Sequence, residues 1–115
     1  MAKLIAAFLT LTLWVAESHA QGVNIMGVGT QACGVWTQHS MGSDTDHIVL
    51  ATWVDGFLSG LNTANLKTGK SYLLGQSMDA NARDAWITAY CQAHPADTLY
   101  AAAQALARNL QDTGR

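Results

Sequence analysis

The sequence predicts an all-α fold: a small single domain of four helices at residues 21–115, held by one disulfide bond. Apolar residues recur every three or four positions along successive stretches, and no useful length alternates with period two. The N-terminus has the three parts of a secretory signal, and the only cysteines, Cys33 and Cys91, both follow it. Together these observations predict one exported helical domain without an internal repeat.

Residues 1–20 have the pattern of a cleavable signal peptide. A lysine precedes an uncharged, largely apolar stretch at 4–15, and small residues, Ser18 and Ala20, stand three and one before the expected cleavage point. We therefore expect a mature chain that begins at Gln21 and is located in the periplasm. The apolar stretch would span only about 18 Å of a hydrocarbon core about 30 Å thick, so we expect no stable membrane anchor.

The charge and cysteine content limit the function classes. A net charge of −2 without a basic cluster argues against a nucleic-acid partner, because phosphates require concentrated cations. Export delivers Cys33 and Cys91 to an oxidising compartment, which predicts that they pair with each other. In the chain-entropy model a closed loop of about 60 residues contributes roughly 4 kcal/mol. A redox or metal site would need a CxxC spacing or further ligands, so we expect neither a metal nor a cofactor.

The first helix is expected to be short. Three glycines between Gln21 and Gly29 predict a flexible lead-in. Thr30 can cap a helix that runs to about His39, in which Cys33 and Trp36 share one face.

The second helix is expected to be the central one. A Gly-Ser-Asp cluster at 42–44 breaks the chain, and Asp44 or Asp46 begins a helix that ends near Asn65. This segment is too apolar for a surface helix, so we expect the other helices to pack around it. Its apolar residues are Ile48, Val49, Leu50, Trp53, Val54, Phe57, Leu58 and Leu61.

The third and fourth helices follow a polar loop at 66–77, which carries an apolar patch at Tyr72 and its two successors. Asp79 is expected to cap a helix over 80–93, which Pro95 ends because proline cannot donate to the helical ladder. Asp97 or Thr98 then begins a helix to about 111, with apolar residues on one face.

Residues 53–60 carry the candidate helix-packing or interface residues: Trp53, Asp55, Gly56, Phe57 and Gly60. Asp55 interrupts an apolar helix, so we expect it to point to the helix rim. Gly56 and Gly60 lie four apart, which favours either close approach of another helix of the domain or a homodimer contact. Most tryptophans are expected in the core, and one is a candidate partner anchor.

No catalytic constellation is found, and we expect a non-enzymatic protein. His39, His47 and His94 have no second ligand at helical spacing, which predicts solvated positions in loops or at helix ends. Ser59 and Asp55 with a distant histidine would make a triad on paper, but Ser59 lacks the context of a nucleophile elbow.

Two family resemblances point to protein binding. The chain has a cysteine followed three residues later by an aromatic residue, then a central helix, then the pattern Tyr-Cys-x-x-x-Pro-x-x-x-Leu-Tyr. This order resembles that of the periplasmic acid-stress chaperones HdeA and HdeB. These positions are Cys33, Trp36, Tyr90, Cys91, Pro95, Leu99 and Tyr100. The resemblance implies a helical, disulfide-linked protein that binds unfolding polypeptides in acid, with no catalytic residue to transfer.

The stretch from Trp53 to Gly60 resembles instead the aromatic-and-glycine helix of Tai-type immunity proteins, which inhibit secreted cell-wall amidases. The chain also has only 12% charged residues, fewer than the acid-stress chaperones have. The leading expectation is therefore an HdeA/HdeB-like protein in which acid protonates aspartates and histidines and opens the fold or a dimer. The alternative is an immunity protein that blocks one specific enzyme.

Overall fold

The computed structural model describes residues 22–40, 45–70 and 73–114. In this part of the chain the prediction of an all-α, four-helix domain with one disulfide is confirmed. The elements are the 3-10 helix η1 (Gly27–Thr30) and the α-helices α1 (Cys33–His39), α2 (Thr45–Lys67), α3 (Ala80–Ala93) and α4 (Leu99–Thr113). The expected signal peptide, the cleavage point before Gln21, the break at 42–44 and Tyr72 lie outside the described residues.

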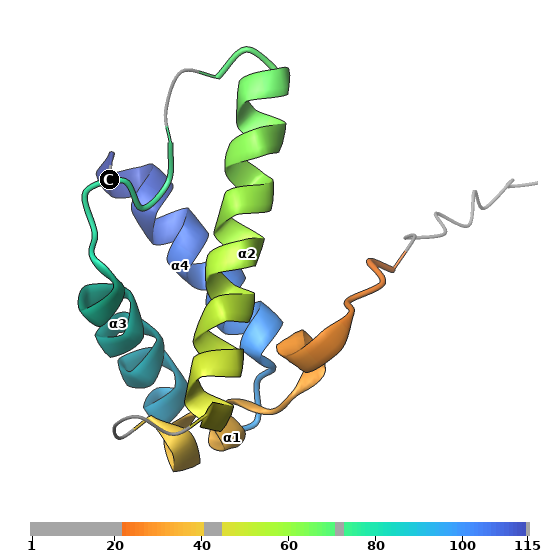
Figure 1. The fold of residues 1–115 in the computed structure, drawn as a ribbon, viewed down its shortest axis with the longest axis vertical. Helices are drawn as coiled ribbons and strands as arrows, with labels where there is room; N and C mark the ends of the chain where they lie inside the picture. The colour runs from red at the N-terminus through yellow and green to blue at the C-terminus, as the bar shows by residue number, and fades with distance from the viewer. Residues whose placement is uncertain (1–21, 41–44, 71–72, 115) are drawn as a thin grey trace, which may run out of the picture.

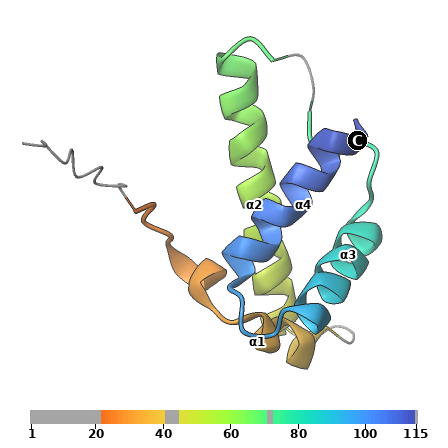
Figure 2. The same ribbon diagram turned by 180° about the vertical axis from the view of Figure 1, so that it is seen from behind.

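The helices diverge from one end of the molecule. Helix α1 lies at that end, and α2 rises from it while α3 returns toward it (Figure 1). Helix α4 starts beside α1 and crosses α2 at an angle, and the C-terminus lies at the far end from α1 (Figure 2). The two ends of the domain are therefore built differently.

The disulfide end consists of α1, the last turn of α3 and the turn at 95–98. Cys33 of α1 and Cys91 of α3 form the disulfide, and both are fully buried. The Cys33 N–H donates to the Asp97 carbonyl at 2.7 Å, and the next amide of α1 donates to the Pro95 carbonyl at 3.2 Å. The turn after α3 thus satisfies amides that the first turn of α1 leaves without an intrahelical partner.

The expected cap at Thr30 is wrong. Its hydroxyl donates to the Gly27 carbonyl within η1, and α1 begins after Ala32, which makes no side-chain cap. Residues 27–30 also form η1 where a flexible lead-in was predicted. The carbonyls of the distant turn at 95–98 accept hydrogen bonds from α1 in place of a local cap. No residue near the start of α1 signals this arrangement in the sequence.

The caps of the last two helices are confirmed. Asp79 accepts a hydrogen bond from the Ala82 N–H at 2.8 Å, and α3 has the predicted bounds. Thr98 accepts one from the Ala101 N–H at 3.1 Å and begins α4. Of the two candidates for that start, the structure therefore selects Thr98.

The expectation that the second helix is central is wrong, because α4 takes that place. Helix α4 presents a buried face of leucines and alanines that contacts α1, α2 and α3. Helix α2 is apolar on more than one side but buries only a narrow stripe, which leaves Ile48 55% and Val49 49% exposed. The alanines of α4 explain why it takes the central position in place of α2, because short side chains let neighbouring helices approach closely. The buried residues of α4 are Leu99, Ala102, Ala103, Leu106, Ala107 and Leu110, and those of α2 are His47, Leu50, Val54 and Leu58.

Candidate functional site

Helices α2 and α3 are joined on their facing sides by two ion pairs, which we call the ion-pair seam. In the first, Arg83 Nε lies 2.9 Å from Asp55 Oδ1, and a second guanidinium nitrogen lies 3.3 Å from Asp55 Oδ2. The same guanidinium also donates to the Met78 carbonyl at the start of α3. Asp55 therefore lies at the helix rim, as expected, and it does so as the partner of an arginine.

In the second pair of the seam, His47 Nε2 donates to Asp84 Oδ2 at 2.7 Å. His47 is buried, with its ring edge-on to Trp36 at a centroid distance of 4.9 Å. The prediction of a solvated position is thus wrong for this histidine, because an aspartate one helix away lets the ring enter the core. Its Nδ1 has no hydrogen-bond partner among the described residues.

The other two histidines also face aspartates. His39 Nδ1 lies 3.9 Å from Asp46 Oδ2, and His94 Nδ1 lies 4.0 Å from Asp97 Oδ2. His94 is exposed at the end of α3, where solvation was predicted. Within the described ranges, no group of three or more histidine, cysteine, aspartate or glutamate side chains could hold a metal ion.

Gly56 and Gly60 do not admit another helix of the domain, so that prediction is wrong. A Cβ placed on either glycine would have no atom within 4 Å, and both residues are exposed on the outer side of α2. The same side carries Ile48, Val49 and Thr52. Because α2 buries only a narrow stripe, these glycines face outward. The alternative prediction, a homodimer contact, stays a prediction.

Trp53 and Phe57 hold the N-terminal segment against α2. Trp53 stacks on Phe57 at a centroid distance of 5.8 Å and donates its indole N–H to the Met26 carbonyl at 2.9 Å. Gly29 of η1 is buried under the same indole, where a Cβ would overlap the ring. Phe57 also meets the Tyr100 ring edge-on at 5.6 Å. These two aromatic residues therefore have internal partners on both sides.

Ser59 and Asp55 do not form a catalytic arrangement. The Ser59 hydroxyl donates to the Asp55 backbone carbonyl at 2.8 Å, within α2. The Asp55 carboxylate is engaged by Arg83 on the seam. The side chains of Ser59 and Asp55 therefore bond to different partners and not to each other.

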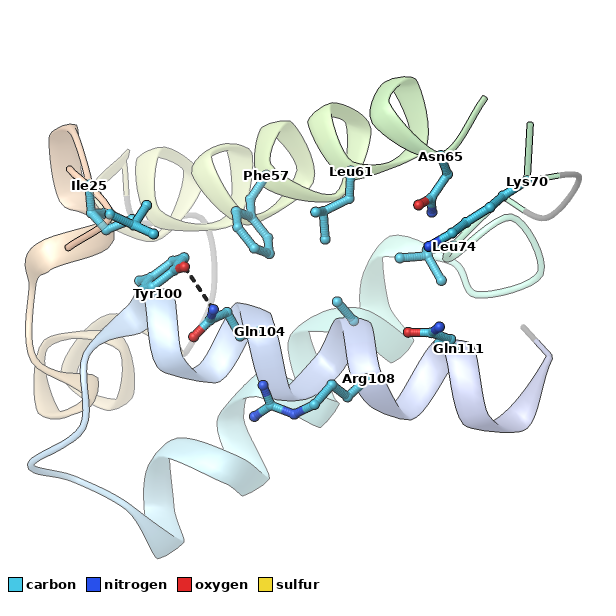
Figure 3. Close-up of a pocket in the computed structure, with 12 residues that line it drawn as sticks. Ile25, Phe57, Leu61, Asn65, Lys70, Leu74, Tyr100, Gln104, Arg108 and Gln111 are labelled. Carbon is cyan, nitrogen blue, oxygen red and sulfur yellow. Dashed lines mark hydrogen bonds between the residues drawn. The ribbon is translucent and has the colours of Figure 1, made fainter. Parts of the chain in front are cut away.

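An apolar groove between α2 and α4 was not predicted from the sequence. It has a volume of about 500 Å³ and is lined from both helices, the N-terminal segment and the loop before α3 (Figure 3). Two of its three α2 residues, Phe57 and Leu61, are apolar and carried a signal in their helical spacing; the third is Asn65. That spacing indicates a packed face and does not show that the face stays partly open.

Comparisons with known protein families, with curated proteins and with solved structures find no match for this chain. Among the described residues, no helix combines the length and the apolar character that crossing a membrane requires.

Proposed function

We propose that this chain is a non-enzymatic exported protein of HdeA/HdeB-like type, which binds unfolding polypeptides when acid separates α2 from α3. The ion-pair seam carries this proposal. Both of its pairs depend on an ionised aspartate, Asp55 or Asp84. A neutral carboxyl group does not attract an arginine or a protonated histidine as a carboxylate does, so strong acid would weaken both pairs.

Separation at the seam would uncover apolar surface. The buried stripe of α2 contains Leu50, Val54 and Leu58, all of which belong to the core. Beside them, Ile48 and Val49 are already exposed. A displaced α2 would therefore offer one continuous apolar face to an unfolding client.

The disulfide would keep the opened chain compact. Cys33 and Cys91 lie 58 positions apart, and α2 lies entirely between them. The helix is consequently tethered at both ends after it leaves α3. The disulfide is also typical of an oxidising compartment, which supports export to the periplasm.

Suppression of client aggregation tests this function. We expect the mature protein to prevent aggregation of an acid-unfolding enzyme at pH 3 and to have no such effect at pH 7. The double variant Asp55→Asn with Asp84→Asn should raise the pH at which this activity begins. Its matched control is Asp112→Asn, an exposed aspartate near the end of α4 and outside the seam. Equal activity at both pH values, or none, would reject the proposal.

The outer side of α2 favours a second candidate, an immunity protein of Tai type. The glycines at 56 and 60 leave a preformed surface beside the exposed Ile48 and Val49, and no packing among the described residues explains them. This candidate predicts a stoichiometric complex with one secreted cell-wall amidase at pH 7. Affinity capture from periplasmic extract at pH 7 and pH 3 separates the two, because the chaperone should instead retain many proteins, and only in acid.

A further inference from the structure

The N-terminal segment of the chain itself enters the groove between α2 and α4. Val23 and Ile25 line this groove, whereas Asn24 and Met26 line only a second hollow, beside Trp53. Successive side chains of an extended chain point to opposite sides, and Met26 has the extended backbone angles φ −104° and ψ 152°. The groove therefore already receives an extended chain with apolar side chains at every second position.

The groove continues beyond this segment. Phe57 and Leu61 of α2 point toward α4, with Ile25 at one end of the space and Lys70 at the other (Figure 3). The α4 residues that line it run from position 100 to position 111, which is about 16 Å at 1.5 Å per residue. An extended chain rises about 3.3 Å per residue, so about four further residues fit along this length.

The polar side chains of the groove are spread along it and do not converge on one point. Tyr100 and Gln104 lie on α4 near Ile25, and Asn65 lies on α2 toward the other end (Figure 3). The Gln104 amide donates to the Tyr100 hydroxyl at 2.7 Å, so the Gln104 carbonyl oxygen can accept and the Tyr100 O–H can donate. Such a distributed set suits a peptide backbone, whose N–H and C=O groups repeat along the chain.

The spacing on α4 also matches an extended peptide. Tyr100 and Gln104 are four positions apart, which is about 6 Å along the helix axis. Equivalent backbone groups of an extended chain recur every two residues, about 6.6 Å apart. Successive polar groups of the rim can therefore meet successive backbone groups of one peptide.

We propose that the groove binds an extended polypeptide segment that has apolar side chains at alternate positions. These side chains lie against Phe57 and Leu61, and the backbone bonds to Gln104 and Asn65. The inference rests on the proposed function for its class of partner, and it adds a site that exists while α2 still lies against α3. The buried stripe of α2 does not line this groove, so the two surfaces are distinct.

The charges around the groove favour an uncharged segment over a ligand with one charged head group. Lys70 and Arg108 both border the groove, but the Arg108 guanidinium lies near Gln104 on the outer side of α4, far from Lys70 (Figure 3). No aspartate or glutamate is among the described residues that line the groove. A basic segment would therefore meet only like charges there.

An NMR titration of the mature protein at pH 7 with two pentapeptides of identical composition tests the proposal. The first, acetyl-Ser-Val-Ser-Ile-Ser-amide, has alternating apolar side chains, and the second, acetyl-Ser-Ser-Val-Ile-Ser-amide, does not. We expect one saturable site for the first peptide, with amide shifts at residues that line the groove. The second should bind about ten-fold more weakly, because only one of its apolar side chains can face the groove.

Three variants locate the site. Gln104→Leu should weaken the first peptide about five-fold, which corresponds to the loss of one hydrogen bond. Its matched control is Gln92→Leu, an exposed glutamine of α3 that does not line the groove, and this change should leave binding unaltered. Leu61→Trp should fill the groove and abolish binding, with helical circular dichroism retained. If Leu61→Trp fails to fold, the two glutamine variants still decide the matter.

The absence of saturable binding, equal affinity for the two peptides, or equal losses in Gln104→Leu and Gln92→Leu would overturn the inference. Saturable binding of 1-decanol with no binding of either peptide would also overturn it and would indicate a lipid-like ligand. Failure of this site is distinguishable from failure of the proposed function. Aggregation suppression at pH 3 without peptide binding at pH 7 would reject the groove alone, and peptide binding without suppression in acid would reject the acid chaperone alone.

Discussion

The disulfide end and the ion-pair seam each hold α3 to another helix, but by different means. At the disulfide end, α1 and α3 share a buried covalent bond, and backbone amides of α1 are bonded to the turn at 95–98. Trp36 adds a hydrogen bond from its indole N–H to Thr88 Oγ1 at 2.9 Å. At the seam, α2 and α3 meet through side-chain charges, and the Asp55 side chain is 48% exposed.

On the proposed function, this difference separates the part of the molecule that resists acid from the part that responds to it. A disulfide and backbone hydrogen bonds do not lose a charge when the pH falls, whereas an aspartate pair does. On the proposed function, the disulfide end is the fixed part of the molecule and α2 is the helix that acid releases.

The largest effect is expected from the disulfide end. Cys33→Ser should lower the free energy of unfolding by about 2 to 5 kcal/mol, because the unfolded chain regains the freedom of a long loop. Cys91→Ser should have the same effect, and the double variant should be no worse than either single variant. Urea denaturation measures these differences, and free thiols in the natively purified protein would contradict the prediction.

The next effect concerns two glycines in opposite surroundings. Gly29→Ala should cost about 1 to 3 kcal/mol, because its Cβ would overlap the Trp53 ring, which Phe57 and the Met26 carbonyl hold in place. Gly56→Ala should stabilise the protein by roughly 0.5 to 1 kcal/mol, since it lies exposed in a helix with no neighbouring atom. Thermal unfolding of both variants provides the comparison. A loss of stability in Gly56→Ala would instead indicate that this face is covered, as in a homodimer.

Tyr90 provides a pH test of the disulfide end. Its hydroxyl donates to Asp97 Oδ2 at 2.7 Å. This bond, followed by burial and by the Asp97 charge, raises the pKa of Tyr90 above its ordinary value of 10.0. The folded state therefore holds the proton more strongly, so this contribution is fully present below about pH 10 and is lost as the pH rises through the folded-state pKa. Tyr90→Phe should cost about 1 kcal/mol at pH 7 and reduce the alkaline loss of stability, as urea denaturation at pH 7 and pH 11 would show. An unchanged alkaline loss would exclude Tyr90 as its source.

The smallest effect is expected at the seam under neutral conditions. Asp55→Asn should lower the free energy of unfolding at pH 7 by about 0.5 to 1 kcal/mol, because the Arg83 pair is partly exposed and screened by solvent. High salt should reduce this difference. A cost as large as that of Cys33→Ser would contradict the distinction between a fixed end and a releasable helix.

Much of the fold was predictable from local patterns. Helix α3 needed only Asp79 at its start and Pro95 beyond its end, and α4 needed a cap and a regular apolar face. These signals act within one or two turns of the chain. Helix α1 was harder, because carbonyls of the turn at 95–98 cap it, more than 60 positions away in the sequence.

The candidate site was less predictable because its partners are distant in sequence. Asp55 was identified as unusual, but its partner Arg83 lies 28 positions away, and Asp84 lies 37 positions from His47. Helix spacing cannot reveal such pairs. The outward direction of Gly56 was missed for a related reason, since α2 is apolar on more than one side and its pattern does not show which side is buried.

The most direct test of the central claim is a pH titration from 7 to 2 that records apolar-dye fluorescence and helical circular dichroism together. The account predicts that dye binding rises toward pH 3 while most of the helical signal remains, because α2 leaves the seam without unfolding. Asp55→Asn combined with Asp84→Asn should raise the pH at which dye binding begins, and Asp112→Asn should follow the wild type. A wild-type protein that stays dye-silent down to pH 2 would contradict the acid-release account and leave the specific inhibitor as the better explanation.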